Sequence, residues 1–110
     1  MKIESAPAEK NNKPEQSWCV YIIEASDNSL YTGITNNFPR RWQQHLSGKG
    51  GAKFFRGRQP QALRLLEPQQ DRSSASRREA AIKKLSRTAK LSLIQTSGFL
   101  SDEGALYHQG

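Results

Sequence analysis

Cysteine is nearly absent from this chain, which has only Cys19 among its 110 residues. A single cysteine cannot form a disulfide within the chain, and a lone buried thiol is typical of the reducing cytoplasm. Cys19, His45 and His108 also show none of the paired ligand spacings of zinc sites. The sequence therefore excludes a disulfide-stapled domain and a zinc finger, and it predicts a cytoplasmic protein.

Long apolar runs are absent too, and only 35% of the residues are hydrophobic. No run approaches the roughly 20 apolar residues that a membrane span needs. The first residues lack the apolar core of a signal peptide. We therefore expect no membrane segment, and the length predicts one domain with a small core.

Acidic residues are outnumbered, since 10 Asp and Glu stand against 17 Lys and Arg and leave a formal net charge of +7. Such an excess raises the local concentration of anions and favours nucleic acid or an anionic membrane as a partner. The chain lacks a basic amphipathic helix with exposed aromatic residues, which a membrane-surface protein would use. Nucleic acid is therefore the favoured partner.

Apolar runs and turn residues predict an α/β domain in the α+β sense, with the order β-β-α-(α)-β-α-α. Residues 18–23 are continuously apolar, as in a strand covered on both faces, and residues 30–35 are again rich in β-formers. The turn residues 27–29 between them predict an antiparallel hairpin. Residues 62–67 add a third strand, so we expect a small three-stranded antiparallel sheet flanked by helices.

Capping residues indicate where the first helix begins. Asn36 or Asn37 can cap a helix whose apolar stripe is Phe38, Trp42 and Leu46. Glycines at positions 48, 50 and 51 end this helix, and a further short helix can follow.

The second half of the chain carries two more helices. Asp71 or Ser73 can cap a long helix that reaches Leu85, and Ser86 can cap a last one. The expected divisions are a disordered tail over 1–17, a folded domain over 18–97 and a weakly ordered end over 98–110.

Two tyrosines on the predicted hairpin are the first candidate site residues. Tyr21 and Tyr31 can lie on one face of the two strands, a few ångströms apart. A strand tyrosine is most often a core residue, but Gly33 follows Tyr31 within the same strand. A glycine inside a strand often marks a close approach by another backbone or by a ligand.

Arg41 and His45 lie one helical turn apart, directly after the hairpin and beside the apolar stripe. Taken alone, Arg41 is most often a solvated charge and His45 a satisfied helix histidine. Together they can serve a shared function, since the planar fork of an arginine gives a phosphate two parallel hydrogen bonds.

Glu79 lies in a strongly basic predicted helix and has two interpretations. It can form a weak ion pair with Lys83, four residues later. It can also hold a hard divalent metal, if its face of the helix is packed, as the neighbours Ala80, Ala81 and Ile82 suggest. The spacing alone leaves both open.

Cations surround the glycines that follow the first helix. Such a stretch can approach a phosphodiester backbone closely, or it can be an ordinary solvated loop, and the net charge favours nucleic acid. The candidate nucleic-acid-binding residues are Gly33, Arg40, Lys49, Lys53, Arg56 and Arg58.

Taken together, these residues resemble the GIY-YIG nuclease family, over about Trp18 to Leu93. Residues 19–21 (Cys-Val-Tyr) stand at the first motif and residues 31–33 (Tyr-Thr-Gly) at the second. The matches that follow in order are the helix arginine Arg41, His45 where members carry His or Tyr, and the metal-binding glutamate Glu79. The residue pattern between Leu30 and Gly50 is most similar to that of the stand-alone bacterial YhbQ-type members.

The resemblance implies the GIY-YIG fold and a one-metal endonuclease that hydrolyses DNA phosphodiesters with Mg²⁺ or Mn²⁺, in DNA repair or processing. In that scheme Tyr21 or Tyr31 accepts the proton of a water, Arg41 stabilises phosphate charge and His45 assists. Glu79 holds the metal. The alternative is a nucleic-acid-binding module with the same fold and little or no cleavage activity.

Three positions depart from the family pattern. The glycine and isoleucine of the first motif are Cys19 and Val20, and a lysine that some members carry after the second motif is Ile34. A late asparagine of homing-type members has no counterpart after Glu79. These departures concern the rate of the reaction more than its class.

Overall fold

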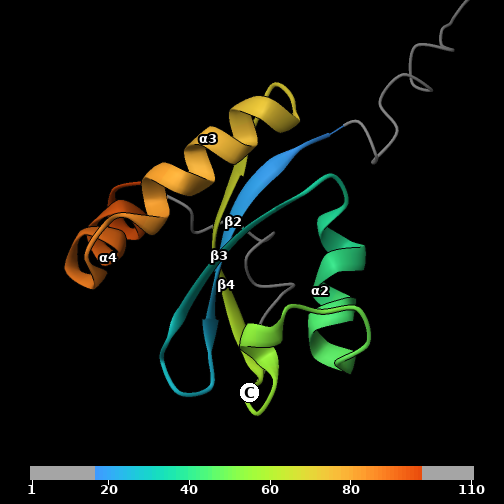
Figure 1. The fold of residues 1–110 in the computed structure, drawn as a ribbon. Helices are drawn as coiled ribbons and strands as arrows, with labels where there is room; N and C mark the ends of the chain where they lie inside the picture. The colour runs from blue at the N-terminus through green and yellow to red at the C-terminus, as the bar shows by residue number, and fades with distance from the viewer. Residues whose placement is uncertain (1–16, 98–110) are drawn as a thin grey trace, which may run out of the picture.

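A three-stranded antiparallel sheet forms the centre of the computed structural model, which describes residues 17–97 (Figure 1). The strands are β2 (Cys19–Ala25), β3 (Leu30–Thr35) and β4 (Pro60–Pro68), and β2 lies between the other two. The predicted three-stranded sheet and its antiparallel pairing are confirmed. The predicted tails, 1–17 and 98–110, lie outside the described residues except for Ser17.

The central strand is covered on both faces, as its continuous apolar run predicts. Val20 to Ile23 are fully buried. Because side chains alternate along a strand, Tyr21 and Ile23 belong to one core cluster while Val20 and Ile22 belong to the other. Helix α2 (Phe38–Ser47) packs on the first face, and α3 (Arg72–Lys83) and α4 (Arg87–Thr96) pack on the second (Figure 1).

Helix α2 (Phe38–Ser47) begins at Asn37, which is the one of the two candidate caps that the structure uses. The Asn37 side chain accepts a hydrogen bond from the backbone N–H of Arg40, as an N-cap does. Phe38 and Trp42 are buried on the predicted stripe. His45 is buried with them, because it faces the sheet rather than the solvent.

The remaining helices follow their predicted order. A short 3₁₀ turn, η2 (Lys53–Phe55), precedes β4, and α3 (Arg72–Lys83) and α4 (Arg87–Thr96) follow it. Asp71 and Ser86 are their caps. Among the described residues, no helix combines the length and the apolar character that crossing a membrane requires.

Two details of the predicted helices are wrong. Helix α3 ends at Lys83, short of Leu85. Ala80 and Ala81 are exposed, so they do not mark the packed face of α3, which instead buries Ala75 and Ile82 against the sheet. The cause is helical spacing, because positions 75, 79 and 82 share one face while 80 and 81 turn away from it.

One buried hydroxyl gives a prediction about stability. Among the described residues, Thr32 Oγ1 is a buried side-chain oxygen that has no hydrogen-bond partner. Since an unsatisfied buried hydroxyl costs about 1–3 kcal/mol, Thr32→Val should raise the free energy of unfolding by about 1 kcal/mol. Thr35→Val is the matched control, because Thr35 Oγ1 accepts from the backbone N–H of Asn37 at 3.1 Å. The control should lose stability in the same urea titration, and equal losses in both variants would contradict the prediction.

Candidate active site

Tyr21 stands at the centre of an aromatic cluster on the α2 face of the sheet. Its ring centroid lies 5.1 Å from that of Phe38, 6.0 Å from that of His45 and 6.1 Å from that of Tyr31. Tyr31 and His45 are themselves 5.5 Å apart. The hairpin and α2 thus bring together both tyrosines and the histidine, as their positions in the sequence predict.

Hydrogen bonds fix the orientation of His45. Its Nδ1 accepts from the backbone N–H of Ala52 at 3.4 Å, and its Nε2 lies 3.0 Å from Tyr21 Oη. A neutral imidazole that accepts at Nδ1 carries its proton on Nε2. His45 therefore donates to the Tyr21 oxygen, and Tyr21 can donate its own phenolic hydrogen elsewhere.

Gly33 makes room for Tyr21. The two residues are directly opposite in the register of β2 and β3. A Cβ at position 33 would lie 2.6 Å from Tyr21 Oη and 3.0 Å from a ring carbon of Tyr31. The close approach expected at this glycine is therefore made by the tyrosine side chains of the cluster itself.

Arg41 joins the cluster from α2 and holds the glycine loop 48–51. Nη1 has two hydrogens and donates to Gln44 Oε1 at 3.0 Å and to the backbone carbonyl of Gly50 at 2.7 Å. The loop packs tightly there, since a Cβ on Gly51 would lie 2.8 Å from the Gln44 carbonyl. Arg41 is half-buried, so its guanidinium is partly open to a ligand.

The surroundings of the two tyrosines differ. Burial and the neighbouring Tyr31 raise the pKa of Tyr21 well above its ordinary value, and Arg41 opposes this only in part. Tyr21 therefore keeps its proton at neutral pH in the free protein. Tyr31 is only half-buried, so its phenol is the more accessible of the pair.

His45 gives a prediction about pH. Burial, with a smaller contribution from the Arg41 charge, lowers the pKa of His45 to about 4, from an ordinary value of 6.5. Above pH 6.5 the histidine is neutral in both folded and unfolded chains. As the pH falls from 6.5 to 4, only the unfolded chain takes up the proton, so folding should lose up to about 3 kcal/mol.

The control for this pH effect is His45→Phe, which removes the titrating group. Urea unfolding at several pH values between 7 and 4 should show the wild type losing stability faster than the variant. Parallel losses in the two proteins would contradict a buried neutral His45.

Glu79 lies on α3, which packs on the other face of the sheet from Tyr21 and His45. Its side chain is 23% exposed and its carboxylate pairs with Lys83 at 3.1 Å, so the weak ion pair is present. No group of three or more Asp, Glu, His and Cys side chains forms a metal cluster within residues 17–97. A single carboxylate can hold Mg²⁺ only if the ion keeps several water ligands and takes its other oxygen ligands from a substrate phosphate.

Four of the candidate cations are exposed, namely Arg40, Lys49, Lys53 and Arg56. Arg58 is engaged within the fold. It pairs with Asp27 at 2.8 Å, donates to the Phe54 carbonyl and lies 4.2 Å above the Phe54 ring. The exposed cations thus lie along α2, the glycine loop and η2, beside the aromatic cluster.

Sequence reasoning missed the contribution of Phe54 and Phe55. The Phe55 ring is buried with its centroid 4.6 Å from that of His45, and Phe54 lies 5.2 Å from Tyr31. Two adjacent aromatic residues, the first of them three positions after Gly51, were a possible signal, because a glycine loop can fold back onto the helix before it. Ala52, the backbone donor to His45, carries no such signal.

A search against protein-family models matches the GIY-YIG catalytic domain over residues 17–92. A UPF0213 protein of Syntrophus aciditrophicus is 51% identical over 76 residues, which span 69% of this chain and 87% of that protein. The UPF0213 protein YhbQ of Escherichia coli (O139:H28) is 46% identical over 83 residues, with 74% of this chain and 82% of that protein covered.

A solved structure is similar as well. The solution NMR structure of the UPF0213 protein BH0048 from Bacillus halodurans is 40% identical and has a TM-score of 0.51. The match covers 76% of this chain and 88% of that protein. The shared fold is the α+β arrangement described above.

Proposed function

Since the chain belongs to the GIY-YIG catalytic-domain family, we propose that it is a metal-dependent endonuclease that hydrolyses DNA phosphodiester bonds. The observation that carries the proposal is the cluster of Tyr21, Tyr31, Arg41 and His45, assembled from three separate elements on one face of the sheet. Exposed cations beside this cluster give a phosphodiester backbone several points of contact.

Arg41 is suited to bind the phosphate at which the chain is cut. Its Nη1 already bonds to one carbonyl oxygen, that of Gly50, and a phosphate oxygen can take that place. A fixed cation aimed at developing negative charge lowers the barrier most when it needs no rearrangement in the transition state. The bond to Gln44 supplies such a fixed orientation.

Tyr31, once it has lost its own phenolic proton, is the more suitable tyrosine to receive the proton of the attacking water. It is half-buried, whereas Tyr21 is fully buried and holds its proton firmly. In this scheme Tyr21 packs against Tyr31 and His45 and positions them, and it does not contact the substrate. His45 fixes the Tyr21 oxygen through the hydrogen bond from Nε2.

Glu79 is the residue that would hold Mg²⁺ or Mn²⁺. Because β3 is an edge strand, a phosphate lying along that edge can be approached from both faces of the sheet. A divalent ion supplies charge stabilisation at the phosphate oxygens when it is bound. Glu79 must first leave Lys83, which costs little because such exposed helix pairs contribute about 0.3–0.5 kcal/mol.

A DNA-binding module with little cleavage is the second candidate. It is favoured by the Glu79–Lys83 pair and by the fact that no group of three or more Asp, Glu, His and Cys side chains gathers among the described residues. We further propose that the protein is cytoplasmic and that it acts in DNA repair or processing.

One assay tests the proposed function. Labelled single-stranded, duplex and branched DNA are incubated with the protein and Mg²⁺, Mn²⁺ or EDTA. We expect cleavage that EDTA abolishes, and Glu79→Gln should raise the Mg²⁺ concentration for half-maximal cleavage by at least about tenfold.

The matched control is Glu67→Gln, which also removes an ion-paired carboxylate, in this case from the pair with Arg78. This variant should keep the Mg²⁺ dependence of the wild type. Salt-sensitive DNA binding without cleavage by the folded wild-type protein would support the binding module instead.

A further inference from the structure

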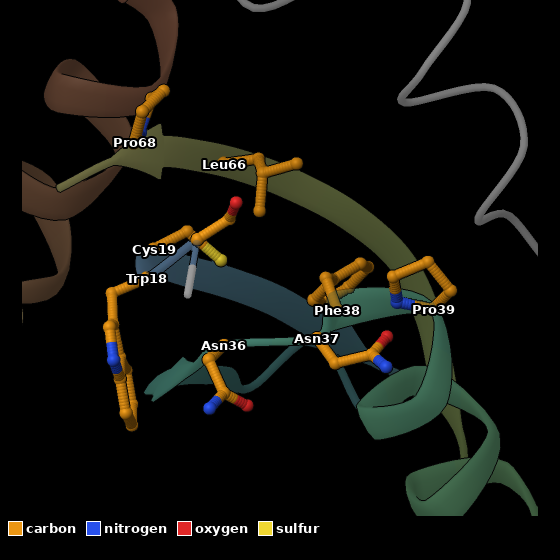
Figure 2. A pocket seen from close by; sticks show the side chains of 9 residues that line it. Trp18, Cys19, Asn36, Asn37, Phe38, Pro39, Leu66 and Pro68 are labelled. Atoms are coloured by element: carbon orange, nitrogen blue, oxygen red, sulfur yellow. The ribbon is translucent and has the colours of Figure 1, made fainter. Parts of the chain in front are cut away.

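A pocket opens where the sheet begins, between the start of β2, the end of β4 and the start of α2 (Figure 2). Its volume is about 320 Å³, near the lower end of the range for small-molecule sites. A cavity of this size suits a single ring system better than a large ligand. None of its lining residues is acidic: they are Ser17, Trp18, Cys19, Asn36, Asn37, Phe38, Pro39, Leu66 and Pro68.

The pocket walls combine flat apolar surface with amide groups. Trp18 forms one wall, and Phe38 and Leu66 lie across from it (Figure 2). Asn36 and Asn37 bring side-chain amides to the same rim; the Asn37 oxygen already accepts from the Arg40 N–H, so this side chain chiefly offers its N–H donors. Aromatic walls for stacking and amides for the polar edge are the chemistry that recognises a nucleobase.

The pocket adjoins the catalytic cluster. Phe38 lines the pocket and also contacts Tyr21, with 5.1 Å between their ring centroids. Cys19 lines the pocket two residues before Tyr21 on the same face of β2, which is roughly 7 Å along a strand. A base seated in the pocket would therefore belong to a nucleotide close to the phosphate at Arg41.

Two arginines lie next to residues that line the pocket, Arg40 after Pro39 in the chain and Arg72 beside Trp18. Arg40 is exposed in the first turn of α2, which has no acidic residue. The guanidinium of Arg72 lies 5.6 Å from the centroid of the Trp18 ring, on the other side of the strand. These cations can contact the phosphates on either side of the seated base.

We propose that this pocket binds one unpaired nucleobase of the substrate strand, and that the protein thereby prefers single-stranded or locally unpaired DNA. The inference rests on the proposed function only in taking DNA as the substrate. A base within a duplex is stacked and paired, so it cannot enter a pocket unless it is extruded at an energetic cost. An already unpaired base avoids that cost.

The single cysteine of the chain makes the test direct, because Cys19 lines the pocket and is partly exposed. The rate of alkylation of Cys19 is measured in EDTA, so that no cleavage occurs. At a concentration about ten times its dissociation constant, oligothymidine should slow the reaction about tenfold. An abasic strand of equal length and charge, and a duplex, should leave the rate unchanged when bound to the same extent.

Two variants distinguish base binding in the pocket from base-independent binding of the DNA backbone. Asn36→Ala should weaken oligothymidine binding about tenfold while leaving the affinity for the abasic strand unchanged. Gln95→Ala, an exposed amide on α4, is the matched control and should bind both strands as the wild type does.

Three outcomes would overturn the proposal. Oligothymidine that binds, by fluorescence anisotropy, without protecting Cys19 would rule out the pocket while leaving the proposed nuclease intact. Equal protection by the abasic strand would assign the effect to phosphate contacts. A thiol that is already unreactive in the free protein would mean that the chain itself fills the pocket.

Discussion

Replacing Arg41 with alanine is expected to slow DNA cleavage about 10²–10³-fold with at most a small loss of stability. The estimate follows from the loss of one preorganised electrostatic donor, which is about 2.7–4 kcal/mol in the transition state. The fold should survive because Arg41 is half-buried and its hydrogen bonds to Gln44 and to the Gly50 carbonyl lie near the surface rather than in the core. Single-turnover cleavage at saturating Mg²⁺ and DNA gives the rate directly.

Two further variants show whether the charge or the position of Arg41 matters. Arg40→Ala removes the same charge from the neighbouring, exposed position and should slow cleavage at saturating DNA less than about tenfold, because its main effect is weaker DNA binding. Arg41→Lys keeps the charge but loses the planar fork, so it should stay well below the wild-type rate. Equal effects of Arg40→Ala and Arg41→Ala would contradict a catalytic role for Arg41.

Gly33→Ala is expected to have the largest effect on the site as a whole. The added methyl group would lie 2.6 Å from Tyr21 Oη, and Tyr21 cannot move easily because its ring contacts Phe38, His45 and Tyr31. Overpacking of this kind costs about 1–3 kcal/mol of stability. Cleavage should fall at least as far as in Arg41→Ala, since the methyl displaces both tyrosines together.

A double-mutant cycle tests that explanation. Tyr21→Leu removes the phenol that the Gly33 methyl would strike, so the second substitution should cost much less in this background. Thermal or urea unfolding of the four proteins gives the coupling energy, and cleavage of DNA reports the geometry of the site. If the two changes in unfolding free energy are additive, the contact between positions 21 and 33 does not explain the need for glycine.

The fold was largely predictable because its signals are local. Continuous apolar residues predict the central strand, and capping residues predict the helix starts within one or two alternatives. The choice of Asn37 over Asn36 and of Asp71 over Ser73 depends on backbone geometry at each cap. The packed face of α3 was less predictable, because a run of small residues does not say which ones face the sheet.

The candidate site was predictable as a set of residues but not as an arrangement. Pairing across the hairpin brings Tyr21 and Tyr31 together, and helical spacing does the same for Arg41 and His45. The contacts that hold them come from the loop after α2, through the Ala52 N–H and the Gly50 carbonyl. Backbone groups carry no sequence signal, so these contacts required the structure.

The bond between Arg41 and the Gly50 carbonyl has a consequence for turnover. A phosphate that binds to Nη1 must displace the carbonyl, so the strength of the bond to the carbonyl is subtracted from that of the charge-assisted bond to the phosphate. The same carbonyl can return as the cleaved end departs. In the proposed nuclease, the glycine loop therefore acts as an internal competitor that limits product inhibition.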